Sequence, residues 1–162
     1  MSQEYILERS LSPSEAAARL DITVEELEVR RENGTLLGVW MQTSQTWAYP
    51  AFQFAPSVSP YGLERLLSIL ASRVGFSPIT DDRGGWARAF WLFQPNEQLS
   101  FRSRAARGYR DTDPVAFALT ISNLSSVARM PADAFADDPV SVIEMAQSLY
   151  AGLAALSRQE EN

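Results

Sequence analysis

Apolar residues recur at helical spacing within the first 34 positions, between two sequence signals for the start of a helix. The first signal, Ser12–Glu15, combines a hydroxyl cap, a proline at the first helical position and a glutamate three residues after the cap. The second, Thr23–Glu26, repeats the spacing of cap and glutamate, and Asn33 with Gly34 ends the pattern. In the first of these helices Ala16, Ala17 and Leu20 are expected to form one apolar face, and Leu27 with Val29 continues the apolar pattern in the second. We therefore predict two short helices joined by a tight turn, which is a helix-turn-helix.

Two apolar runs, at 35–41 and 46–49, flank the polar residues 42–45 and are typical of short strands. They predict a wing-like hairpin after the two helices, as in a winged or MerR-like head, and we place this head at residues 1–55. The apolar residues 5–7 are expected to form an extended lead-in that packs on the first helix. Trp40 and Trp47 lie in the hairpin, where they either fill the core or contact a partner.

The remaining apolar pattern is helical and follows a connector rich in proline and serine at 55–60, which we take as the boundary to an all-helical domain at 56–162. Helices are predicted at 62–74, at 86–93, after the pair Asp113 and Pro114, and at 139–156. The predicted fold class is therefore mainly α with a small β-hairpin. The residues expected to face inward are Leu63, Leu66, Leu67, Leu70, Val74, Trp86, Phe90, Phe93, Val115, Ala118, Leu119, Leu124, Val142, Met145, Ala146, Leu149, Leu153 and Leu156.

The composition narrows the range of functions. A net charge of −6 argues against general nucleic-acid binding, and all 14 basic residues are arginine. Without cysteine or histidine, the chain lacks thiol nucleophiles, imidazole bases and the commonest zinc ligands. Neighbouring carboxylates at 81–82, 111–113 and 137–138 lie in loops or beside prolines, where capping or turn formation explains them. We therefore expect that the protein is not an enzyme and that it binds neither a metal ion nor a cofactor.

No apolar run reaches the roughly 18 residues that a membrane-spanning helix needs, and the first residues are acidic instead of basic. We expect a cytoplasmic protein that does not enter a membrane.

The second helix of the predicted motif is the element that would enter the major groove of duplex DNA. Its outward positions include two carboxylates, Glu25 and Glu28, which phosphates repel. Arg30 and Arg31 either contact the DNA backbone or pair within the helix with Glu26 and Glu28. The candidate DNA-binding residues are Thr23, Val24, Glu28, Arg30, Arg31 and Gln45.

The strongest basic feature is the stretch 101–110, which holds four arginines and no acid. Forked guanidinium groups bind oxyanions in pairs, so these side chains either contact a phosphate or an acidic partner, or pair with the chain's own carboxylates at 81, 82, 111 and 113. The candidate partner-binding residues are Arg102, Arg104, Arg107 and Arg110.

Two short motifs, Tyr49–Phe54 and Trp91–Asn96, resemble signatures of the Xre/MbcA/ParS-type antitoxin proteins. In that family a helix-turn-helix head, a segment reading Tyr-Pro-x-x-Gln-Phe, a leucine-rich helix and a Trp-Leu-x-x-Pro-Asn turn follow in this order. The similarity covers about residues 12–100. Family members then continue with a Gly-Arg-x-Pro segment and a Leu-Leu helix, whereas this chain continues with Ser100–Arg107.

The resemblance implies that the chain binds a cognate toxin, such as a RES-domain protein that consumes NAD, and represses its own operon as a homodimer or larger assembly. The first functional hypothesis is therefore a DNA-binding regulator of the antitoxin type. The alternative is a protein-interaction module on a helix-turn-helix scaffold that no longer binds DNA. The apolar stripe of the last helix either forms the dimer interface or closes the chain's own core.

Overall fold

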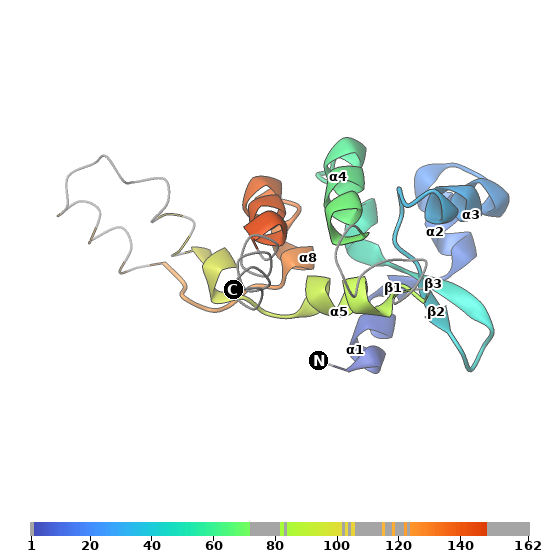
Figure 1. Cartoon of the computed structure of the whole chain (residues 1–162), viewed down its shortest axis with the longest axis horizontal. Helices are drawn as coiled ribbons and strands as arrows, with labels where there is room; N and C mark the ends of the chain where they lie inside the picture. Colours follow the sequence, from blue (N-terminus) through green and yellow to red (C-terminus); the bar gives the residue numbers. More distant parts are fainter. Residues whose placement is uncertain are drawn as a thin grey trace, which may run out of the picture.

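The computed structural model describes residues 2–71, 82, 84–101, 103, 105, 115, 118, 122 and 124–148 (Figure 1). Within these residues the chain is mostly helical and carries one small antiparallel sheet of three strands. The predicted class, mainly α with a small β component, is confirmed at this level.

The chain begins with α1, Gln3–Glu8, where an extended lead-in was predicted; that prediction was wrong. The Ser2 hydroxyl accepts a hydrogen bond from the Tyr5 amide at 3.4 Å and caps the helix, and Ile6 is fully buried. Six residues are too few to show a helical period in the sequence. Strand β1, Ser10–Leu11, follows and pairs with β3.

Helices α2, Pro13–Leu20, and α3, Val24–Glu32, begin at the two predicted caps. In both, the cap hydroxyl accepts from the glutamate amide and the glutamate carboxylate accepts from the cap amide, at 3.4 and 2.8 Å for Ser12 and 3.2 and 2.9 Å for Thr23. Asp21 ends α2 in the left-handed region with φ 53°, and Gly34 follows α3 with φ 82°.

The two apolar positions that continue the pattern in α3 lie on opposite faces of the helix. Leu27 is fully buried, but Val29 is 59% exposed. Two positions along a helix are about 200° around its axis, so these side chains lie on opposite faces. A buried Leu27 therefore leaves Val29 in solvent.

The hairpin consists of β2, Val39–Met41, and β3, Thr46–Pro50, with Trp40 opposite Trp47, and the strand order is β1-β3-β2. Strand β2 begins four residues later than predicted, because the backbone of Leu37 is bonded to a side chain. That side chain is the amide of Gln53 in the 3₁₀ helix η1, Ala51–Phe54.

Helices α4, Pro60–Ala71, and α5, Trp86–Phe93, confirm two predicted helices. The four leucines of α4 are buried as expected, whereas Val74 lies outside the described residues. In α5 the inward face was only partly predicted, because Trp86 and Phe90 are half-buried, with their rings tilted by 35° and their centroids 5.8 Å apart. The buried residues of α5 are Arg88, Ala89, Leu92 and Phe93.

Asp82 explains why α5 begins where it does. Its carboxylate, 3% exposed, accepts from the amides of Ala87 and Arg88 at 2.8 and 3.1 Å and pairs with Nε of Arg88 at 2.7 Å. The capping role expected for this aspartate is confirmed, and the buried ion pair adds to it.

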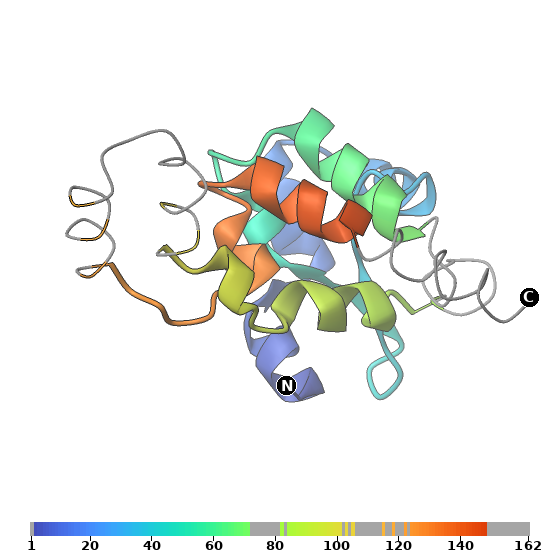
Figure 2. The ribbon, with the colours of Figure 1, turned by 60° about the vertical axis from the view of Figure 1, so that its left-hand side comes forward.

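The chain then forms the 3₁₀ helix η2, Glu97–Leu99, helix α8, Pro131–Ala134, and a helical stretch at 139–148. Figure 2 shows the last of these and α4 on the same side of α5. Val142, Met145 and Ala146 are buried as predicted. Val115 and Ala118 are exposed, so their predicted inward orientation was wrong: spacing shows which residues share a face, not whether anything covers it. Leu119, Leu149, Leu153 and Leu156 lie outside the described residues.

The buried apolar residues form one cluster that runs across the connector at 55–60. Tyr5 and Phe52 both meet the ring of Phe93 edge-on, at 6.4 and 6.2 Å between centroids. The backbone of Trp40 is bonded both to Gly84 and to the Trp86 indole. The predicted division at residue 55 thus coincides with continuous packing, and it stays a prediction.

Candidate interaction surfaces

The residues predicted to bind DNA do not form one surface. Thr23 caps α3, and Gln45 lies in the hairpin turn, where its amide donates to the Gln42 carbonyl at 2.7 Å. Figures 1 and 2 show the hairpin turn pointing away from the side that carries α3. Val24 is half-buried, so Glu28 and Arg30 are the exposed candidates on α3 itself.

Arg31 is turned toward the hairpin. Its guanidinium lies 4.1 Å from the ring centroid of Trp47, and its side chain is 17% exposed. A Cβ at position 38 would come within 2.8 Å of the arginine side chain, so Gly38 makes room for it. The intrahelical pairing was expected with Glu26 or Glu28, but Arg31 pairs with Glu32 at 3.2 Å.

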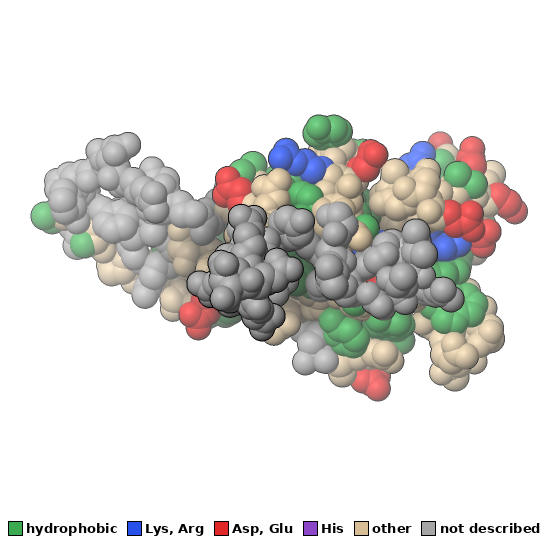
Figure 3. All heavy atoms as spheres, in the orientation of Figure 1, with side chains coloured by type: hydrophobic (Ala, Val, Ile, Leu, Met, Phe, Trp, Pro, Cys, Tyr) green, Lys and Arg blue, Asp and Glu red, His purple; other side chains and the backbone are tan. Residues whose placement is uncertain are grey.

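The solvent-facing side of α3 is acidic. Glu25, Glu28 and Glu32 are exposed around the exposed Val29, and the Glu26 carboxylate caps the helix beside them. A shallow groove of about 330 Å³ runs over this surface, lined by Glu25, Glu26, Val29 and Arg30. Figure 3 shows acidic side chains gathered over α2 and α3. We call Glu25, Glu28, Val29 and Glu32 the outer face of α3.

The four arginines predicted to bind a partner, Arg102, Arg104, Arg107 and Arg110, lie outside the described residues. An arginine that the sequence did not single out, Arg129, lies over the ring of Phe101 at 4.3 Å.

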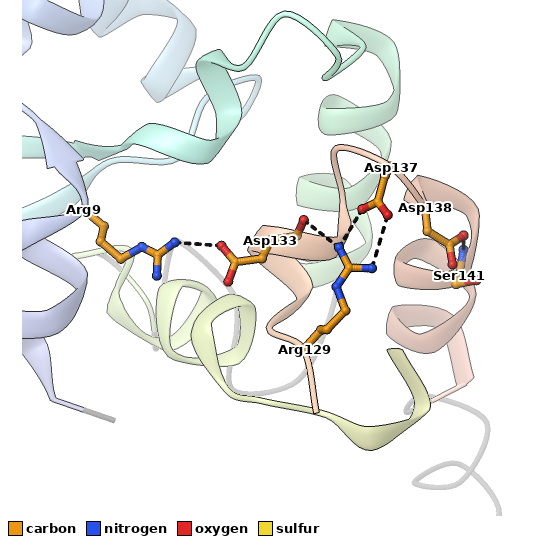
Figure 4. Close-up of polar contacts among 6 residues, drawn as sticks. All are labelled: Arg9, Arg129, Asp133, Asp137, Asp138 and Ser141. Carbon is orange, nitrogen blue, oxygen red and sulfur yellow. Dashed lines mark hydrogen bonds and ion pairs between the residues drawn. The ribbon is translucent and has the colours of Figure 1, made fainter. Parts of the chain in front are cut away.

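Arg129 is the centre of a polar network (Figure 4). It donates to both carboxylate oxygens of Asp137 at 2.7 and 3.2 Å and to the carbonyl of Asp133 at 3.2 Å. The Asp133 carboxylate accepts from Arg9 at 2.8 Å, which connects α8 to the residue after α1. Asp138 accepts from the Ser141 amide at 3.3 Å, in agreement with the capping role expected for the pair 137–138.

The backbone of Arg129 also pairs with a residue that is distant in the sequence, Asn96. The amide of Asn96 donates to the carbonyl of Arg129 at 2.9 Å, and the amide of Arg129 donates back at 3.2 Å. Where the chain leaves the turn at 91–99, the hydroxyl of Ser103 donates a hydrogen bond to the Glu97 carbonyl at 3.0 Å. The turn at 91–99 and the segment from Arg129 to Pro131 are therefore neighbours, although about 30 residues separate them in the sequence.

Among the described residues, the pKa values of Glu15 and Tyr49 are shifted. Hydrogen bonds from the side chain and then the backbone of Ser12 lower the pKa of Glu15 in the α2 cap. Burial raises the pKa of the Tyr49 phenol, and the charge of Arg31 offsets part of that rise. The Tyr49 hydroxyl and the Nε of Arg31 are both buried without a hydrogen-bond partner among the described residues.

Among the described residues, no group of acidic side chains could hold a metal ion. None of the described helices combines the length and the apolar character needed to cross a membrane. Comparisons with family models, with curated proteins and with solved structures found no match to this chain. The function is therefore argued from the chemistry of the two surfaces.

Proposed function

We propose that this chain is a protein-binding module of the antitoxin type, whose two-helix head is a helix-turn-helix scaffold that does not bind DNA. The observation that carries the proposal is the outer face of α3, where three exposed carboxylates surround Val29 while the guanidinium of Arg31 is packed on Trp47 and pairs with Glu32 at its edge. The head is a MerR-like arrangement in this proposal, with β2 and β3 as the wing.

Electrostatics favours this proposal over operator binding. Affinity for duplex DNA comes largely from lysine and arginine side chains that neutralise phosphates. A helix with this outer face would bring three carboxylates toward the phosphates and leave Arg30 as the exposed cation of α3. The net charge of −6 adds a repulsive long-range field.

The bridge between Asn96 and Arg129 supports the antitoxin-like part of the proposal. The family pattern continues from its Pro-Asn turn into Gly-Arg-x-Pro, and here Ala128–Pro131, with the sequence Ala-Arg-Met-Pro, lies beside that turn through the Asn96–Arg129 bridge. The next long helix carries the buried pair Val142 and Ile143, where the family has a Leu-Leu helix. We interpret residues 100–127 as an insertion into an otherwise family-like helical half.

The first experiment measures binding of the full chain to duplex DNA, including its own upstream region, over a series of salt concentrations. We expect no binding at low salt, and Arg30→Ala should behave like the native chain. Binding that falls steeply with salt and weakens further in Arg30→Ala would overturn the scaffold role.

The second candidate is the autoregulating, DNA-binding antitoxin. The exposed Arg30 and the two capped helices of the head favour it, and it predicts salt-dependent operator binding in that same measurement. Both candidate functions include a RES-domain-like toxin as the partner. If the neighbouring reading frame encodes this toxin and its product arrests growth, co-expression of this chain should restore growth.

Assembly and location stay predictions. Val142, Met145 and Ala146 are buried in the chain's own core, so the described part of the last apolar stripe offers little to a homodimer. The mass of the chain in solution tests the dimer, and fractionation of the source cells tests the cytoplasmic location.

A further inference from the structure

The outer face of α3 contains repulsions that the chain does not need for folding. Glu28 is three residues after Glu25 and four residues before Glu32, the two spacings at which like charges destabilise a helix. Glu32 also lies in the last turn, where the helix dipole disfavours a negative charge and the ion pair with Arg31 at 3.2 Å offsets part of that cost. By contrast, Glu26 is explained by the capping box. The excess charge is thus confined to one face.

An apolar side chain lies among these charges. Val29 is 59% exposed and lines the groove of about 330 Å³ together with two carboxylates, Glu25 and Glu26, and one guanidinium, that of Arg30, while Glu28 and Glu32 lie outside the groove. Charges arranged around an apolar centre are the usual composition of a protein-binding surface, in which the apolar contact gives affinity and the charges select the partner.

We propose that the outer face of α3 is a docking surface for an arginine- or lysine-rich segment of another protein, with an apolar side chain of that segment seated on Val29. The inference rests on the proposed function, because it takes the head to be a protein-binding scaffold. Charge complementarity identifies the occupant: Arg31 offsets part of the Glu32 charge, and a cationic segment relieves the remaining repulsion of Glu28 by Glu25 and Glu32, whereas DNA and anionic lipid surfaces would add to it.

The test uses the full chain and, as probe, a labelled synthetic helical peptide that presents arginines around a central leucine. Its binding is measured by fluorescence anisotropy at fixed ionic strength. Glu25→Gln, Glu28→Gln and Glu32→Gln are combined in one variant. The matched control combines Glu8→Gln, Glu64→Gln and Glu144→Gln, three exposed carboxylates on other elements, so both variants lose the same net charge.

We expect the α3 variant to lose at least tenfold in affinity and the control variant less than threefold. Val29→Asn, which leaves the charge unchanged, should lose several-fold. Equal losses in the two charge variants would mean that the peptide senses only net charge, and an unaffected Val29→Asn would remove the apolar contact; either result overturns the docking surface.

A stability measurement tests the repulsion itself. Glu28→Gln should raise Tm by about 1–3 °C, because two like-charge pairs disappear. A lower Tm would contradict the argument.

The DNA titration separates the two claims. If the native chain binds duplex DNA, the proposed scaffold role fails whatever the peptide does. If it binds no DNA and the two charge variants bind the peptide equally, only the docking surface fails.

Discussion

At the scale of single residues, the side-chain amide of Gln53 makes the hydrogen bonds to the Leu37 backbone that a neighbouring strand would otherwise make. Its oxygen accepts from the Leu37 amide at 2.9 Å, and its nitrogen donates to the carbonyls of Leu37 and Pro50 at 2.8 and 3.1 Å, all at a site that is 5% exposed. We expect Gln53→Ala to lower the free energy of unfolding by about 2–4 kcal/mol, because buried backbone groups lose their partners. Urea titration measures this. Gln147→Ala, at an exposed helical position, should change stability by less than about 0.5 kcal/mol, and equal effects would refute the role of Gln53.

Tyr49 lies four residues earlier in the same motif, and we expect its polar group, unlike that of Gln53, to contribute no stability at pH 7. Its hydroxyl is buried without a hydrogen-bond partner in the described part of the chain, so Tyr49→Phe should leave stability at pH 7 unchanged or slightly raised. Burial raises the pKa of this phenol in the folded chain above its usual 10.0, so the unfolded chain releases the proton first. The stability that this shift contributes is complete below pH 10.0 and is lost as pH rises through the folded pKa.

The measurement that checks Tyr49→Phe is urea unfolding of both proteins at neutral and alkaline pH. The variant should lose less stability than the native chain on going to alkaline pH. The same alkaline loss in both proteins would show that the phenol does not contribute.

At the scale of elements, hydrogen bonds hold Asn96 and Arg129 together, the two residues that flank the segment 97–128. The mutual backbone bonds of these two residues and the Asp137–Arg129 ion pair all lie outside residues 104–126. We expect a chain in which a short glycine-serine linker replaces 104–126 to unfold cooperatively, with a Tm within a few degrees of the native value. Loss of cooperative unfolding, measured by circular dichroism, would show that residues 104–126 are needed for the fold. The same variant lacks Arg104, Arg107 and Arg110, so weaker toxin binding by a folded variant would support their predicted role.

The sequence predicts elements well where one local signal suffices. The two capping boxes define the starts of α2 and α3, and helical spacing defines α4 and α5, because these signals depend on neighbours within a turn. Helix α1 was missed because six residues show no period, and strand β1 because its partner β3 is distant in the sequence. The late start of β2 depends on Gln53, which lies 16 residues further on.

The candidate surfaces were less predictable for the same reason. The acidic character of α3 follows from its sequence, but the withdrawal of Arg31 depends on Trp47 and Gly38 across the hairpin. The network of Arg129 depends on Asn96, Asp133 and Asp137, which only the folded chain brings together. Spacing in the sequence contains no information about such contacts.

At the scale of the whole molecule, the shared core implies that the predicted head at 1–55 does not fold alone. Its rings Tyr5 and Phe52 pack on Phe93, and the Trp40 backbone is completed by Gly84 and the Trp86 indole. Without these partners a fragment of residues 1–58 would expose apolar surface and leave backbone groups unsatisfied, and small domains have little stability to lose. We expect this fragment to show no cooperative thermal transition and poorly dispersed amide resonances, whereas residues 1–148 should unfold in a single transition. A fragment 1–58 that unfolds cooperatively would instead establish the head as an independent domain.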